Sequence, residues 1–134
     1  LGLDYRVDFK LRDIEAGFDE ENIDVLFLDV QAPHEYIPQA RAAIKPGGFF
    51  ASLVPTFNQV QHLLLALNQN NFAFIEACEI FLRYLKPQPA RLRPTDRMVG
   101  HTGFLVFGRR VEEVDDDVFN DTSSKRASKK RRRD

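Results

Sequence analysis

The stretch Asp24-Val25-Leu26-Phe27-Leu28-Asp29 decides how the rest of the chain is interpreted. Four consecutive apolar residues between two acids are typical of a strand that is buried on both faces, as in the middle of a parallel α/β sheet. In such sheets, ligands bind just beyond the carboxyl ends of the strands. Asp29 stands at that end, so its carboxylate either caps the following helix or points into a binding crevice. The pattern by itself leaves both roles open.

The composition fits one globular domain. Of the 134 residues, 43% are hydrophobic and 29% are charged, and no apolar run approaches the ~20 residues that span a bilayer. The single cysteine, Cys78, excludes an intrachain disulfide, and its apolar neighbours predict that it lies in the core. A cytoplasmic protein is expected. Because the chain begins with Leu1 and not with Met, we also expect that an N-terminal part is missing.

The formal net charge of −1 hides a strong asymmetry near the end of the chain. An acidic run between residues 112 and 121 is followed by a basic run between residues 125 and 133. Both runs are poor in apolar residues, so 111–134 is predicted to be disordered and 1–110 to be the folded domain. The basic run is also compatible with RNA attraction or with nuclear targeting in a eukaryote.

Strand and helix patterns alternate along residues 7–109. The predicted strands are 7–11, 24–29, 49–54, 74–84 and 102–109, and the predicted helices are 35–44 and the segment between Thr56 and Asn70. Strand–helix–strand order predicts parallel crossovers. No helix separates the last two strands, so the final strand is predicted to be antiparallel. We therefore predict an α/β fold of about five strands, resembling the second half of a doubly wound domain.

Local signals mark the ends of both helices. Pro38 is compatible only with a first helical turn, and the stretch 45–48, Lys-Pro-Gly-Gly, predicts a helix stop with a glycine cap. Thr56 and Gln59 match the capping box, in which two side chains satisfy free N–H groups. The second helix has one apolar stripe, formed by Val60, Leu63, Leu64 and Leu67.

Three pieces of the sequence together resemble one family. The first is strand 24–29 followed by Ala32-Pro33, and the second is 44–48 before a strand, a pattern common among S-adenosylmethionine-dependent methyltransferases. The third is the long stretch 92–105, Leu-Arg-Pro-Thr-Asp-Arg-Met-Val-Gly-His-Thr-Gly-Phe-Leu. It closely resembles the C-terminal signature of the tRNA adenine-N1 methyltransferases that modify position 58 of the T-loop. The resemblance covers about residues 1–110.

The resemblance implies a Rossmann-like class I methyltransferase fold whose last strand is antiparallel and whose first two strands are absent from this chain. Those strands carry the glycine-rich cofactor loop, and no Gly-x-Gly occurs here. Half a cofactor site is therefore expected, and the chain alone is not expected to bind S-adenosylmethionine appreciably or to be active. Strand 7–11 would lack its usual neighbour, and strand 24–29 would have an open edge.

The resemblance also assigns roles to two acids. Asp13 resembles the acid that contacts the cofactor's adenine, and the alternative is that it caps a turn. Asp29 resembles the active-site acid, which lies at the cofactor and accepts a hydrogen bond from the amino group of the target adenine. It would hold N1 toward the methyl group and favour the positive charge that N1 gains. His34 stands where the family often has an aromatic residue, and we assign it no catalytic role.

Five residues are candidate tRNA contacts, each with a plainer alternative: Arg93, Arg97, His101, Thr56 and Gln59. The arginines share a basic loop with Lys86 and Arg91, which either binds phosphates or is simply solvated. His101 either contacts substrate or holds a loop, and helix capping alone explains Thr56 and Gln59. No metal-ligand spacing occurs among the three histidines and one cysteine.

The implied function is methyl transfer from S-adenosylmethionine to N1 of adenine 58 in tRNA. The implied assembly is a homo-tetramer, or a hetero-tetramer with a non-catalytic subunit. Two alternatives remain: this chain belongs to the non-catalytic tRNA-binding subunit, or it acts on another substrate with the same fold. The presence of both Asp13 and Asp29 favours the catalytic chain.

Overall fold

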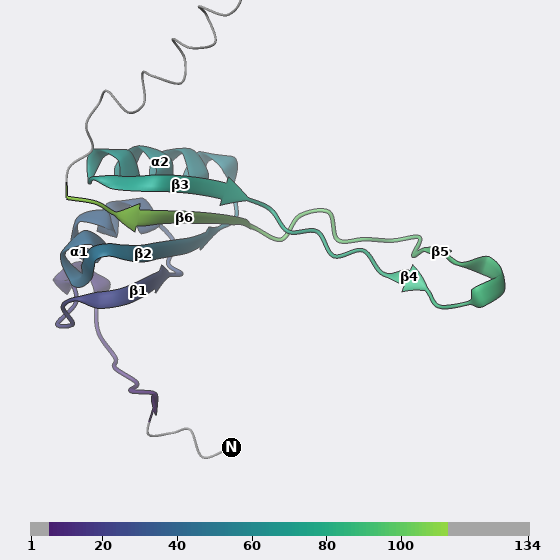
Figure 1. Cartoon of the computed structure of the whole chain (residues 1–134), viewed down its shortest axis with the longest axis horizontal. Coiled ribbons are helices and arrows are strands. Elements are labelled where there is room, and N and C mark those ends of the chain that lie inside the picture. The colour runs from purple at the N-terminus through teal and green to yellow at the C-terminus, as the bar shows by residue number, and fades with distance from the viewer. Residues whose placement is uncertain (1–5, 113–134) are drawn as a thin grey trace, which may run out of the picture.

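The computed structural model describes residues 6–112, which form a four-stranded sheet, two helices and a projecting arm (Figure 1). The sheet has the order β1-β2-β6-β3. Its strands are β1 (Ile23–Leu28), β2 (Ile44–Val54), β3 (Phe72–Cys78) and β6 (Phe104–Arg110). The helices are α1 (Ile37–Ala43) and α2 (Phe57–Gln69), with short 3₁₀ turns at Ile14–Ala16, Pro33–Tyr36 and Pro89–Arg91. The predicted disorder of the charged tail lies almost wholly outside the described residues.

The strand directions match the prediction. β1 and β2 are parallel neighbours joined through α1, and β6 runs antiparallel to both β2 and β3. The connection through α2 carries the chain from β2 to β3, which lies two positions further along the sheet. β6 then fills the slot between β2 and β3, so the last strand of the sequence lies inside the sheet.

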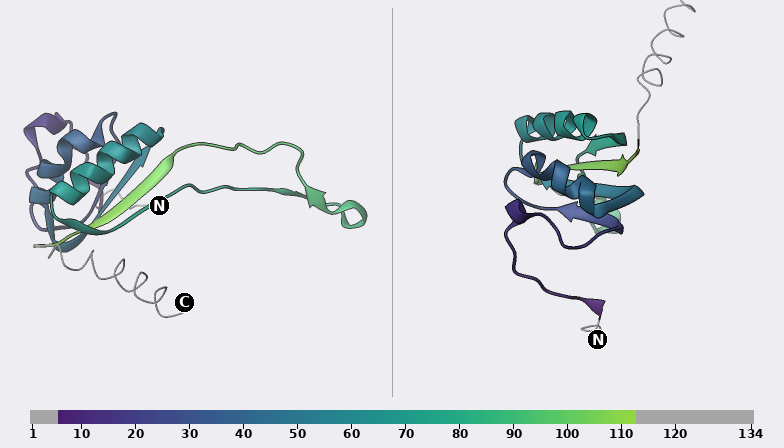
Figure 2. Two further views of the ribbon diagram at one scale, coloured as in Figure 1. Left: turned by 90° about the horizontal axis from the view of Figure 1, so that it is seen from above. Right: turned by 90° about the vertical axis from the view of Figure 1, so that its left-hand side faces the viewer.

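One face of the sheet carries the core. Both helices pack on this face (Figure 2), where α1 contributes Ile37 and Ala40 and α2 contributes Leu63 and Leu67, all fully buried. The stripe predicted for α2 therefore does face the core. The strand residues that meet the helices are Leu26, Leu28, Phe50, Val54, Phe72, Phe104 and Val106. Among the described residues, no helix is long and apolar enough to cross a membrane.

The prediction that strand 24–29 is buried on both faces was wrong. Leu26 and Leu28 are buried, whereas Val25 is 59% and Phe27 is 56% exposed. Side chains alternate across a strand, so these two point to the face that the helices do not cover. Phe49 of β2 and Phe107 of β6 are also exposed. These four side chains form an apolar face that neither helix covers.

The predicted strand 7–11 is not a strand in the structure. Val7, Phe9 and Leu11 are exposed, and so are Asp8 and Lys10 between them, which pair with each other. No described strand lies beside it to supply backbone hydrogen bonds. β1 is correspondingly an edge strand of the sheet, as the expected open edge required.

The first helix ends differently from the prediction. A 3₁₀ turn over Pro33–Tyr36 precedes α1, so the α-helix begins at Ile37 and Pro38 lies in its first turn. The predicted glycine cap was wrong, because the helix ends directly at an extended residue, Ile44, which already pairs with Ile23. Gly47, with φ of +75°, instead serves a bulge inside β2 before the strand resumes at Phe49.

The predicted strand 74–84 was too long, and the predicted core position of Cys78 was wrong. β3 ends at Cys78, which is exposed. A bulge around Phe74, whose φ is +51°, interrupts the alternation that the sequence suggested, and β3 is an edge strand. Residues 79–103 leave the sheet as the arm, which carries the small hairpin β4 (Leu85–Lys86) and β5 (Arg93–Pro94).

Replacing Leu63 by alanine should lower the free energy of unfolding by ~2–5 kcal/mol, because its fully buried side chain would leave a cavity between α2 and the sheet. The matched control is Leu65→Ala on the same helix, where the side chain is 52% exposed and the expected change is within ~0.5 kcal/mol. Urea denaturation followed by circular dichroism measures both. Equal destabilisation by the two variants would contradict the one-faced core.

Candidate active site

The carboxyl ends of β1 and β2 meet at one edge of the sheet, and the arm leaves the sheet from the same side (Figure 1). A buried hydroxyl joins the two ends, because Ser52 Oγ donates to the carbonyl oxygen of Leu28 at 2.7 Å. Leu28 immediately precedes Asp29. The backbone from which the Asp29 side chain extends is therefore fixed to β2.

The carboxylate of Asp29 is exposed and has no hydrogen-bond or ion-pair partner within the described part of the chain. The helical segments that follow begin at other residues, with Ala32 at the N-cap of the 3₁₀ turn and Tyr36 at that of α1. Neither start has a side-chain cap. The capping alternative for Asp29 is therefore excluded, and its carboxylate is free to accept hydrogen bonds at the rim of the sheet.

Thr56 and Gln59 connect the loops that follow β1 and β2. Thr56 Oγ1 accepts the N–H of Gln59 at 3.3 Å and caps α2, as predicted. The second half of the predicted capping box differs. Gln59 Oε1 accepts the Thr56 hydroxyl at 2.8 Å, and Gln59 Nε2 donates to the carbonyl of Gln31 at 2.9 Å. Gln59 thus holds the loop after Asp29 against the start of α2.

Asp13 lies at the other side of this region and caps a turn. Its Oδ1 accepts the N–H of Glu15 at 3.0 Å, at the start of the 3₁₀ turn. Burial raises the pKa of Tyr36, and the nearby carboxylates of Glu15, Glu35 and Asp13 raise it further. Asp13 therefore lies near Tyr36, at the start of α1. The contact to a cofactor remains a prediction.

His101 is engaged through both ring nitrogens. Nδ1 lies 2.6 Å from Glu79 Oε1, and Nε2 lies 2.8 Å from the carbonyl oxygen of Pro55. The carboxylate of Glu79 and, to a smaller extent, this carbonyl raise the pKa of His101 above its ordinary value of 6.5. The ring also packs on Phe104, with centroids 4.8 Å apart. The structure thus places His101 at the root of the arm, beside the loop after β2.

Arg93 and Arg97 lie on the arm, whose strand β5 is well separated from β1 (Figure 1). Arg93 is 4.0 Å from a carboxylate oxygen of Asp96, which also pairs with Lys86. The carbonyl oxygen of Arg97 accepts the hydroxyl of Thr95 at 3.1 Å, whereas its guanidinium has no hydrogen-bond or ion-pair partner among residues 6–112 and lines a cleft with apolar arm residues. The structure therefore separates the predicted site residues into a group at the sheet edge and a group on the arm.

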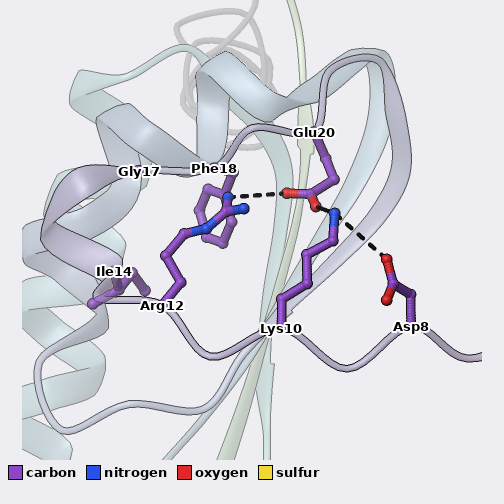
Figure 3. A pocket seen from close by; sticks show the side chains of 7 residues that line it. All are labelled: Asp8, Lys10, Arg12, Ile14, Gly17, Phe18 and Glu20. Carbon is purple, nitrogen blue, oxygen red and sulfur yellow. Dashed lines mark hydrogen bonds and ion pairs between the residues drawn. The ribbon is translucent and has the colours of Figure 1, made fainter.

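A cleft of about 530 Å³ lies beside the N-terminal segment (Figure 3). Its charged side chains pair with one another, since Lys10 binds Glu20 and Asp8, and Arg12 binds Glu20 and Asp19. The bond between Lys10 and Glu20 raises the pKa of the lysine and lowers that of the glutamate. Asp13 does not line this cleft. The free carboxylate of Asp29 therefore marks the better candidate site.

Sequence reasoning missed three residues that organise the sheet edge: Ser52, Gln31 and Glu79. Ser52 had a visible signal, because it is the only polar residue in the run 49–54. Gln31 acts through its backbone carbonyl, which its side-chain type does not indicate. Glu79 meets His101 only because of the path of the arm, which the sequence did not predict. Nor was it foreseen that His34 would pack against His62, with ring centroids 5.1 Å apart. Within the described residues, no group of three or more His, Cys, Asp or Glu side chains could hold a metal ion.

The family model described as "tRNA methyltransferase complex GCD14 subunit" matches residues 2–93. The chain belongs to this family. Among curated relatives, the tRNA (adenine(57)-N(1)/adenine(58)-N(1))-methyltransferase TrmI of Methanocaldococcus jannaschii is 30% identical over 106 residues, covering 78% of this chain and 38% of the relative. The tRNA (adenine(58)-N(1))-methyltransferase TrmI of Thermus thermophilus is 31% identical over 96 residues, covering 72% and 38%.

Solved structures of methyltransferases show which fold this GCD14-family chain has. An S-adenosylmethionine-dependent O-methyltransferase from Thermotoga maritima superposes with a TM-score of 0.82 and 48% identity, covering 86% of this chain and 43% of that one. The tRNA (m1A58) methyltransferase TrmI from Aquifex aeolicus gives 0.70 and 36%, covering 75% and 41%. The fold is therefore a partial Rossmann-like class I methyltransferase fold. The chain spans about two fifths of the length of the relatives and structures that it matches.

Proposed function

We propose that this chain is part of an S-adenosylmethionine-dependent enzyme that methylates N1 of adenine 58 in tRNA. The observation that carries the proposal is the free carboxylate of Asp29 at the carboxyl edge of the sheet, where this fold class binds its ligands. The family, and the activity for which the TrmI relatives are named, support the choice of tRNA adenine as substrate.

The residues present suit one side of a cofactor site. Asp29 and Asp13 offer carboxylate oxygens, which accept hydrogen bonds from the amine and hydroxyl groups of S-adenosylmethionine. When bound, this cofactor supplies an activated methyl group. The chain contains no Gly-x-Gly, so these acids would hold it together with residues that the chain does not contain.

Asp29 would act on the target base in two ways. Its carboxylate accepts a hydrogen bond from the exocyclic amine of adenine, which orients the ring and its N1 atom. Methylation leaves a positive charge on the base, and a fixed carboxylate close to that charge stabilises the transition state in which it develops. Ser52 holds the backbone next to Asp29, so only the side chain of Asp29 has to be oriented when the base arrives.

The arm would bind the tRNA backbone. Arg93 and Arg97 are exposed on the arm, and Arg97 is free to pair with a phosphate. Thr56, Gln59 and His101 remain predictions as tRNA contacts, because their polar atoms already bond within the chain. With tRNA as the proposed substrate, we propose a cytoplasmic location, or a nuclear one in a eukaryote.

One observation favours a second candidate function. The Thermotoga maritima structure, at 48% identity, bears the name of an O-methyltransferase. The same fold and the same free acid then serve methylation of an oxygen on another substrate. A hydroxyl nucleophile loses a proton during methylation, whereas adenine N1 does not, so the two functions differ in their need for a base.

Replacing Asp29 by asparagine in the full protein encoded by its gene should lower kcat for tRNA methylation by about 10²-fold, because the charge beside the reacting base is lost. Transfer of labelled methyl groups to tRNA measures the rate. Asp24→Asn is the matched control, since Asp24 lies at the opposite end of β1 and pairs with Lys45 at 2.5 Å. Its kcat should stay unchanged.

The substrate is tested with tRNA in which adenine 58 is replaced by guanosine. This tRNA should accept no methyl group at that position. Equal methylation of both tRNAs, or an Asp29→Asn variant with full activity, would refute the proposal. Methylation of a hydroxyl substrate with tRNA inactive would favour the second function.

Replacing Arg93 and Arg97 together by glutamine should weaken tRNA binding and reduce the slope of log affinity against log salt by about one for each lost phosphate contact. Filter binding of tRNA between low and physiological salt measures the slope. Lys45→Gln is the control, because Lys45 lies at the start of β2, at the end of the sheet opposite to the arm, and pairs with Asp24. An unchanged slope in the arginine variant would show that the arm does not hold phosphates.

We also propose that copies of the full protein assemble, as a homo-tetramer or with a non-catalytic subunit, through the arm. The arm exposes large apolar side chains that its own two strands cannot bury, namely Ile80, Phe81, Leu82, Tyr84, Leu92, Met98 and Val99. Contiguous exposed apolar surface of this kind typically marks a protein interface. The name of the Dictyostelium discoideum relative, a "catalytic subunit", agrees with a complex of more than one chain type.

Leu82→Glu should therefore reduce the assembly to smaller species in sedimentation velocity, because a buried charge without a partner is costly at an interface. Leu65→Glu, an exposed apolar position on α2, should leave the sedimentation coefficient unchanged. If both variants sediment like the unmodified protein, the arm is not the interface.

A further inference from the structure

The two hydrogen bonds of His101 fix the number of protons on its ring. Its partners are the carboxylate of Glu79, at 2.6 Å from Nδ1, and the carbonyl of Pro55, at 2.8 Å from Nε2. A carbonyl and an ionised carboxylate only accept hydrogen bonds, whereas a neutral imidazole carries a single N–H. Both bonds can form together only when the imidazole carries two protons, that is, as the imidazolium cation.

These bonds join three separate segments at the root of the arm. Glu79 follows β3 on the outgoing segment of the arm, His101 precedes β6 on the returning segment, and Pro55 follows β2. The ring packs on Phe104, which in turn contacts Phe57 at the start of α2, with centroids 4.4 Å apart. The set of Glu79, His101 and the Pro55 carbonyl is called the root clamp below.

The root clamp is linked to the candidate active site through the segment that follows Pro55. Pro55 adjoins Thr56, whose partner Gln59 donates to the carbonyl of Gln31, two residues after Asp29. The arm and the Asp29 loop are thus tied to the same short segment, 55–59. Glu79 is the only other titratable side chain that lines the cleft around His101 in the described structure.

We infer that His101, as the imidazolium of the root clamp, is a positioning residue that holds the arm in a fixed relation to Asp29. This inference rests on the proposed function in one respect, namely that the arm binds the tRNA whose adenine reaches Asp29. The clamp itself stands on its donor and acceptor geometry. Deprotonation removes one of the two donors, so one bond is lost and the returning end of the arm at His101 is released either from Glu79 or from the loop after β2.

The direction of the pH dependence follows from this geometry. Glu79 raises the pKa of His101 above 6.5 in the folded chain, so the cation persists to higher pH there than in the unfolded chain. The contribution of the clamp is fully present below about pH 6.5 and is lost as the pH rises through the raised pKa. tRNA binding should therefore weaken on the alkaline side, before any base in the RNA titrates.

The first test is nuclear magnetic resonance of the chain with ¹⁵N-labelled histidine. At neutral pH both ring nitrogens of His101 should show the shifts of protonated nitrogens, and its titration midpoint should lie above 6.5. Glu79→Gln should lower that midpoint by removing the charged acceptor. His62→Gln, at an exposed histidine on α2, is the control and should leave it unchanged. A neutral His101 with a midpoint at or below 6.5 would overturn the inference.

The second test separates positioning from a merely structural role in the full protein encoded by its gene. His101→Gln should raise KM for tRNA about tenfold at pH values where the unmodified clamp is cationic, remove the dependence of KM on pH, and leave kcat at saturating tRNA unchanged. His101→Arg keeps two donors and a permanent charge, so it should restore a low KM and abolish its rise at high pH. An arginine variant no better than glutamine, with both variants folded by circular dichroism, would contradict the clamp.

The two tests keep this inference apart from the proposed function. If the unmodified protein methylates no tRNA, the proposed function fails, while the nitrogen shifts of His101 still decide whether the clamp is cationic. If methylation proceeds but KM for tRNA is independent of pH and of His101, the positioning role fails and the proposed function stands.

Discussion

Burial of one face of the sheet against α1 and α2 is the constraint on which the rest of the structure depends. Leu28, Phe50 and Leu63 meet in a single core, and each such side chain contributes ~1.5–3 kcal/mol by leaving water. Because side chains alternate, this burial fixes which residues of every strand turn away from the helices. The register between β1 and β2, and with it the position of Asp29 beside the end of β2, is a consequence of this packing.

Polar contacts at the carboxyl ends of the strands hold together the loops that the packed core brings close to one another. Ser52 joins the ends of the two parallel strands, Gln59 joins the loops that follow them, and His101 joins the second loop to the arm. Each contact ends on a backbone carbonyl, so each holds main chain and leaves the carboxylate of Asp29 unoccupied. A site built in this way keeps its acceptor free for a ligand while its frame is fixed.

The sequence allowed the sheet and α2 to be predicted because these features depend on local periodicity. The apolar stripe at Leu63 and Leu67, the cap at Thr56 and the antiparallel last strand were all confirmed. Burial of Val25 and Phe27 could not be judged, because it depends on which elements cover the second face. The predicted burial of Cys78 was wrong for a similar reason. The bulge in β3 and its position at the edge of the sheet depend on strand pairing, which composition does not reveal.

The position of β6 in the sheet determines the order in which this chain can fold. β6 is the last strand in the sequence, yet it lies between β2 and β3 and pairs with both, as Phe49 and Ala73 share Arg109 as their partner. β3 cannot join the sheet until the whole arm, 79–103, has been made and β6 has arrived. During synthesis, β3 therefore has no strand to pair with until β6 has been made. Closing such non-local pairs is slow, because a long loop must be ordered before any pairing rewards it.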